Sequence, residues 1–159
     1  MRTLPGPTRL TLALALALAA CKATPPSRLE RAVAAEVKRH VTVGGRTDRN
    51  PLIATEEDLR RGREAFSSYC MACHGLDGQN TGVPFADAMS PPVPRLTDPE
   101  VQRYTDGQLH WIVENGLFPS GMPAGRGLLN DEEMWRIVLF IRHLPPAGSL
   151  GEPAMYSAK

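Results

Sequence analysis

The sequence has few cysteines, few aromatic residues and no excess of either charge. Lysine and arginine number 18 and aspartate and glutamate 17, for a formal net charge of +1. Nucleic-acid-binding domains usually carry a clear basic excess, so we expect no nucleic-acid partner. The longest apolar run, from Leu10 to Ala20, has eleven residues, whereas a helix that spans a bilayer needs about 20.

The three cysteines, Cys21, Cys70 and Cys73, are too few for two common kinds of site. A structural zinc site draws four ligands, typically in two pairs, and the sequence has no second CxxC and no HxxxH. A small secreted domain held by disulfides has a larger, even number of cysteines. Neither kind of site is favoured.

The amino terminus is predicted to be a processing signal. Arg2 and Arg9 precede the short apolar run, which ends at small residues, as in a signal peptide. The boundary "LAAC" resembles a bacterial lipobox, in which the cysteine receives a diacylglyceryl group and becomes the first mature residue; an ordinary cleavable signal is the alternative. We expect residues 1–20 to be removed and Cys21 to be lipidated. Two acyl chains suffice for stable anchoring, so the protein is expected to be exported and to face the periplasm or cell exterior of a bacterium.

Residues 21–54 are predicted to be a linker with one short amphipathic helix. Pro25 and Pro26 stiffen its start. Apolar residues then recur at helical spacing within 28–41, at Leu29, Val33, Val37 and Val41. This helix either packs on the following domain or lies on a membrane surface or a partner. The turn-forming "GGRTDRNP" predicts the domain border.

Three longer helices are predicted in a domain that spans 55–145. The first begins after Thr55 as N-cap, the second covers 106–116, and the third covers 130–144 and ends before Pro145. Gly62 lies inside the first helix, where glycine costs about 1 kcal/mol relative to alanine, so we expect another helix to cross closely there. The residues between Gly75 and Pro99 are predicted to be loop, and residues 146–159 an extended tail.

The motif "YCMACHGLDG", residues 69–78, has three possible uses. It could form half of a zinc site, act as a dithiol switch, or attach a haem covalently. The zinc site lacks its second half, and the dithiol motif expects a βαβ context that the pattern does not provide. Two thiols at this spacing can add to the two vinyl groups of one haem, and the next histidine can ligate the iron. We therefore predict one haem c attached at Cys70 and Cys73, with His74 as a ligand.

Four segments in this order resemble a class I cytochrome c domain over residues 55–145: "GREAFSSYCMACHGLDGQ", "TDGQLHWIVENG", "PSGMP" and "DEEMWRIVLFIRHL". The resemblance implies an all-α fold of about three to four helices wrapped around a covalently attached haem, with long Pro/Gly-rich loops. It also implies that His74 is the proximal ligand and that Met122, in "GMP", is the sixth. Met89 is the rival sixth ligand.

The resemblance also assigns roles to residues around the haem. It implies that the first and last helices cross through Gly62, Phe66 and Phe140, and that Pro94 and Leu96 line the haem. Trp111 and Trp135 are expected to pack in the core, and His110 and His143 to lie at the surface.

The expected function is therefore electron transfer. We expect a monohaem electron carrier rather than an enzyme, tethered through Cys21, with unidentified redox proteins as partners and no small-molecule substrate. One alternative is a haem-bearing subunit of a larger dehydrogenase or oxidase complex. A second is a sensor or peroxidase with five-coordinate iron, which requires that Met122 is not a ligand.

Overall fold

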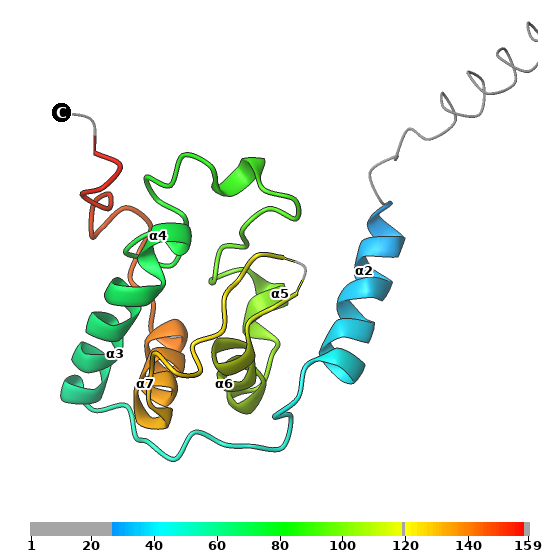
Figure 1. Ribbon diagram of the computed structural model, residues 1–159, viewed down its shortest axis with the longest axis horizontal. Helices are drawn as coiled ribbons and strands as arrows, with labels where there is room; N and C mark the ends of the chain where they lie inside the picture. The colour runs from blue at the N-terminus through cyan, green and yellow to red at the C-terminus, as the bar shows by residue number, and fades with distance from the viewer. Residues whose placement is uncertain (1–26, 119, 158–159) are drawn as a thin grey trace, which may run out of the picture. The chain divides into compact units, whose positions relative to one another are not determined.

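The computed structural model describes residues 27–118 and 120–157 (Figure 1). Cys21 and the predicted signal peptide lie outside these residues. The described chain is helical and has no strand, which confirms the all-α prediction. Its helices are α2 (Arg28–Val37), α3 (Glu56–Tyr69), α4 (Met71–His74), α5 (Pro99–Gln102), α6 (Asp106–Asn115) and α7 (Asp131–Arg142), with a π-helix at Lys38–Thr42 and a 3-10 helix at Ala86–Ala88.

The chain divides into two compact units with the border between Ala34 and Ala35, inside α2. The predicted apolar stripe on α2 and the π-helix is exposed, with exposed fractions from 50% to 79% at Leu29, Val33, Val37 and Val41. None of the helices in the described part of the chain has the length and hydropathy needed to cross a membrane.

Side-chain caps begin the three longer helices where the sequence predicts. The hydroxyl of Thr55 accepts a hydrogen bond from the amide of Asp58 at 3.1 Å at the start of α3. Thr105 with Gln108, and Asn130 with Glu133, form reciprocal capping boxes at the starts of α6 and α7. Each cap satisfies amides that have no partner within the helix, so these starts are set locally by the sequence.

The close crossing of α3 and α7 at Gly62 organises the core. A β-carbon at Gly62 would lie well inside van der Waals contact of the carbonyl oxygen of Arg136, and 3.3 Å from the β-carbon of Phe140. One turn further along, the rings of Phe66 and Phe140 pack with their centroids 5.1 Å apart. The crossing through Gly62, Phe66 and Phe140 is thus present, and it accounts for a glycine inside α3.

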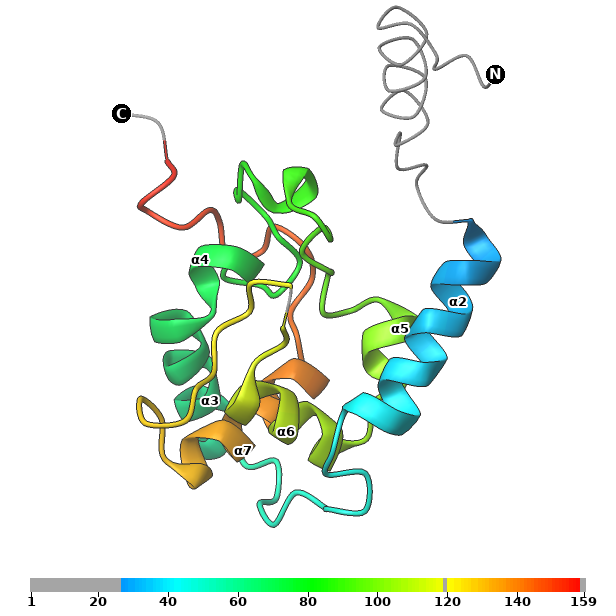
Figure 2. The same ribbon diagram turned by 45° about the vertical axis from the view of Figure 1, so that its right-hand side comes forward.

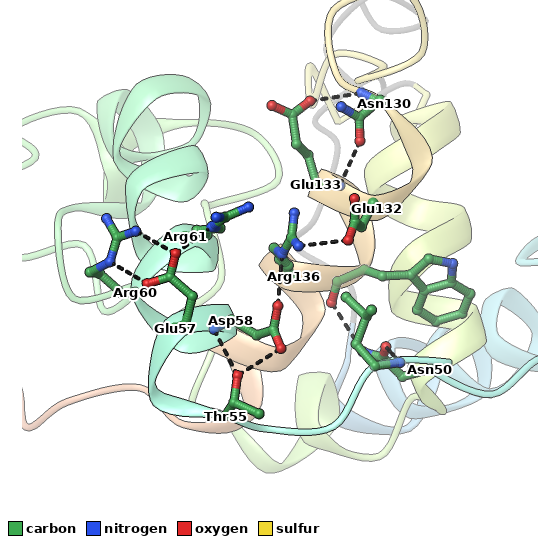
Figure 3. Close-up of polar contacts among 12 residues, drawn as sticks. Asn50, Thr55, Glu57, Asp58, Arg60, Arg61, Asn130, Glu132, Glu133 and Arg136 are labelled. Carbon is green, nitrogen blue, oxygen red and sulfur yellow. Dashed lines mark hydrogen bonds and ion pairs between the residues drawn. The ribbon is translucent and has the colours of Figure 1, made fainter.

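Polar contacts close the outer side of the same crossing (Figure 3). The guanidinium of Arg136 on α7 donates to the carboxylate of Asp58 on α3 at 2.9 Å. The Thr55 hydroxyl and then Arg136 lower the pKa of Asp58. The pairs that Glu57 makes with Arg60 and Arg61 are half exposed, and such surface pairs contribute at most about 1 kcal/mol each.

The segment between the π-helix and α3, which the composition marks as part of a linker, lies against α6 and α7. Val43 is buried. The side-chain amide of Asn50 donates to the carbonyl of Trp135 at 3.0 Å (Figure 3). The same segment also lies very close to α6, where a β-carbon at Gly107 would overlap the backbone at Gly45. Contacts of this kind fix the route by which the chain enters α3.

Replacing Gly62 by alanine should destabilise the domain by about 2–3 kcal/mol or more. The added methyl group would overlap the backbone of α7, and α7 cannot shift away without repacking of the core. Denaturant unfolding of the haem-loaded protein measures the effect. Arg63→Ala, an exposed change on the same helix, is the control and should cost less than about 0.5 kcal/mol. Equal stabilities of the two variants would contradict the close crossing.

Candidate haem site

The CxxCH motif forms a helix of its own, α4, which sequence reasoning missed. Cys70 is both the last cap of α3 and the first cap of α4, and its carbonyl accepts hydrogen bonds from the amides of Cys73 and His74. Gly75, with φ of 71°, ends the helix. Four residues are too few to show helical periodicity. The one sign of this helix in the sequence is that the helical pattern of α3 stops after Tyr69, shortly before Gly75. The helix brings both thiols and the imidazole onto one short turn at the end of α3.

Neither cysteine of the motif is in a disulfide. Burial, and to a smaller extent the neighbouring Cys73, raise the pKa of Cys70 to about 12. Dithiol redox switches need the opposite, a thiolate stabilised by a lowered pKa, so the environment of Cys70 argues against that use. The described residues also contain no cluster of three or more His, Cys, Asp or Glu side chains that could bind a metal ion, which leaves the zinc hypothesis unsupported.

His74 is held as a neutral imidazole with one buried, unpartnered nitrogen. Burial lowers its pKa to about 4, against an opposing effect of the Pro94 backbone. Its Nδ1 atom is buried and has no hydrogen-bond partner within normal limits. The ring of Phe66 packs near it, with centroids 6.4 Å apart. A neutral imidazole is the form of histidine that binds a metal.

Met122 lies on the loop between α6 and α7, and backbone bonds anchor both sides of that loop. The carbonyl of Met122 accepts from the amide of Leu117 at 3.1 Å, and the amide of Gly125 donates to Val113 on α6 at 2.8 Å. Gly116 has φ of 68° and no space for a side chain beside Met122 and Pro123. The loop rises from α6 toward the end of the domain where α4 lies and then descends to the start of α7 (Figures 1 and 2).

The rival methionine, Met89, comes close to the same loop. Its methyl carbon would lie 3.5 Å from a β-carbon at Gly121, the residue before Met122. Met89 and Met122 are both partly buried. The fold therefore brings the two candidate thioethers into one region and does not by itself separate them.

One family model matches this chain, over residues 57–141, which is just over half of the 159 residues, and its description is "Cytochrome C oxidase, cbb3-type, subunit III". The match includes nearly all of α3 and α7, the whole CxxCH motif and Met122. The chain belongs to this family of c-type cytochrome domains. No curated protein is significantly similar to it.

As a c-type cytochrome, the protein carries covalently bound haem c. The residues present fit that group: neither cysteine is in a disulfide, Cys70 precedes one helical turn that contains Cys73, and a histidine that burial keeps neutral ends that turn. Cys70, Cys73 and His74 would hold the haem. The exceptionally exposed Phe118, at 98%, and the partly exposed Met122 belong to the loop expected to face it.

Other residues singled out from the sequence fall into the core or the surface. Leu96 is buried while Pro94 is exposed, and Trp135 is buried in the core. His143 is exposed, as predicted. His110, expected at the surface, is only 12% exposed. The prediction was wrong because the ring of His110 stacks on Trp135 with centroids 4.0 Å apart, a contact between helices that the polar character of α6 does not reveal.

Replacing both Cys70 and Cys73 by alanine in the cytochrome should remove covalent haem completely, because no thiol remains on α4 to form a thioether. Haem staining of the denatured protein on a gel measures this directly. Each single replacement should retain a covalent haem at reduced yield. Staining of the double variant equal to that of the native chain would rule out attachment at this motif.

Proposed function

We propose that this cytochrome is a membrane-tethered, exported electron carrier with one haem, whose axial ligands are His74 and Met122. It passes single electrons between protein partners. The observation that carries the proposal is the placement of Cys70, Cys73 and His74 on or next to the single helical turn α4 at the end of α3. Burial lowers the pKa of His74, and the neutral imidazole is the form of histidine that binds a metal.

A bound haem supplies an iron that gains and loses one electron. His74 packs beside Phe66. Met122 lies on a loop that backbone hydrogen bonds fix at Leu117 and Gly125. With His74 and Met122 both bound to the iron, no position would remain open for a substrate, and the thioether would raise the reduction potential. These residues thus favour electron transfer over substrate chemistry.

Tethering is supported by the composition before the domain and by the surface of α2. Cys21 lies seven residues before Arg28, the first residue of α2. The apolar stripe of that helix is exposed, as expected of a helix that lies on lipid. Such a tether would confine the carrier to the membrane surface and raise its effective concentration near membrane-bound partners.

A second candidate, a permanent haem-bearing subunit of an oxidase complex, is favoured by the description of the matching family. In that case α2 and the carboxyl-terminal residues would be docking elements. The native size of the haem protein in a mild detergent extract separates the two functions. A monomer-sized species is expected for a carrier, and a single large assembly that retains all of the haem would replace our proposal by this one.

Replacing Met122 by alanine should open the iron to carbon monoxide and lower the reduction potential, because the thioether that stabilises the ferrous state is lost. CO difference spectra should change from almost no binding to nearly complete binding. Met89→Ala is the matched control and should keep both properties native. If CO instead binds only the Met89 variant, the ligand is Met89, and if it binds the native protein the five-coordinate alternative holds.

Replacing Cys21 by serine should release the protein from membranes, because the serine cannot receive the thioether-linked diacylglyceryl group and no other acyl chain anchors the chain. Fractionation of cells, followed by haem staining of the soluble and membrane fractions, measures the release. Lys22→Ala, one residue later, should remain in the membrane fraction. Retention of the serine variant by membranes would contradict the lipid tether.

A further inference from the structure

Residues 145–157, which follow α7 and which the composition marks as a tail, form what we define as the C-terminal strap. The strap runs from the end of α7 up beside α4 (Figures 1 and 2). It lies outside the residues that match the family model, which end at 141. The family match therefore does not account for the strap, and its contacts with the haem-attachment segment need their own explanation.

Asp77 anchors the first part of the strap. This carboxylate is fully buried and lies three residues after His74. Its oxygens accept hydrogen bonds from the amide of Gly148 in the strap at 2.7 Å and from the Thr81 hydroxyl at 2.5 Å. The side chain of Gln79 adds a bond to the carbonyl of Pro145 at 2.9 Å. A buried carboxylate is stable only when hydrogen-bond donors satisfy it, and one of the donors to Asp77 belongs to the strap. The conformation of the loop after α4 therefore depends on the strap.

Tyr156 closes the far end of the strap on α4 itself. Its hydroxyl donates to the carbonyl of Ala72 at 2.9 Å, and its ring meets the edge of Phe85 with centroids 5.9 Å apart. Pro153, between the two anchors, is fully buried. Ala72 is the residue between Met71 and Cys73, so the strap contacts the backbone between the two haem-binding thiols.

The bond to Ala72 has a clear role in so short a helix. The last carbonyls of a helix have no partner within it, and a four-residue helix consists almost entirely of such groups. The carbonyls of Cys70 and Met71 bond with the amides of His74 and Gly75. The carbonyl of Ala72 has Tyr156 as its partner among the described residues. Without the hydroxyl, that carbonyl would be left unpaired or would draw in water.

We propose that Tyr156 and Asp77 are positioning residues that clamp the C-terminal strap onto α4, and thereby hold the haem-attachment backbone rigid and dry. The proposal rests on haem attachment at Cys70 and Cys73, but it does not need Met122 as the sixth ligand. Water admitted beside the haem stabilises the ferric state and lowers the reduction potential. The strap therefore raises the potential through α4, although it contributes no ligand.

The test compares three haem-loaded, full-length variants: Tyr156→Phe, Asp77→Asn and, as control, Tyr69→Phe. Tyr69 is also next to the motif and half exposed, and its hydroxyl makes no hydrogen bond to the described residues. In Tyr156→Phe, the amides of α4 should exchange with deuterium about five to ten times faster than in the native protein. The reduction potential should fall. Asp77→Asn should act in the same direction, and Tyr69→Phe should change neither property.

The two readouts separate a positioning role from a merely structural one. Faster exchange throughout α3, α6 and α7 with an unchanged potential would show a general loss of stability and would overturn the proposal. Native exchange in α4 together with a native potential, in both strap variants, would overturn it as well. Failure of the His–Met proposal shows up differently, as CO binding by the native protein, and it leaves the exchange of α4 unaffected.

Discussion

The contact of α3 with α7 at Gly62 is the constraint on which the site depends. The backbone of α7 lies where a side chain on α3 would be, so the two helices have one register. That register places Phe66 against Phe140, and α3 continues from there to Tyr69, next to Cys70. The haem-attachment helix then begins on a rigid support instead of a mobile loop. Packing at a point two turns away thus decides where the thiols and His74 lie.

Some side chains at the site are placed in environments that cost free energy unless a haem is bound. Burial disfavours the charged form of His74, and Phe118 is 98% exposed; each is unfavourable in a helical domain without a cofactor. A covalently attached haem would offset these costs, because it would supply a metal for the imidazole and an apolar face for the loops. A cofactor that completes the core in this way also explains the long Pro/Gly-rich loops.

The longer helices could be predicted because their signals are local. Thr55, Thr105 and Asn130 cap their helices within one turn, and Gly116 and Pro145 mark two of the ends. The short helices α4 and α5 could not be predicted, since four residues show no periodicity and their conformation depends on the contacts around them. The burial of His110 was missed for a similar reason, because its partner Trp135 lies on another helix.

The sequence by itself determined the chemistry of the attachment site, because CxxCH places two thiols and an imidazole within five residues whatever the surrounding fold. It also determined the cofactor, since those groups at that spacing match one haem. The tertiary structure decided what surrounds them. Asp77 meets Gly148, and Tyr156 meets Ala72, across more than 70 residues of sequence, and no local pattern encodes such pairs. The unpartnered nitrogen of His74 and the strap on α4 arise from burial and long-range hydrogen bonding, which exist only once the chain has folded.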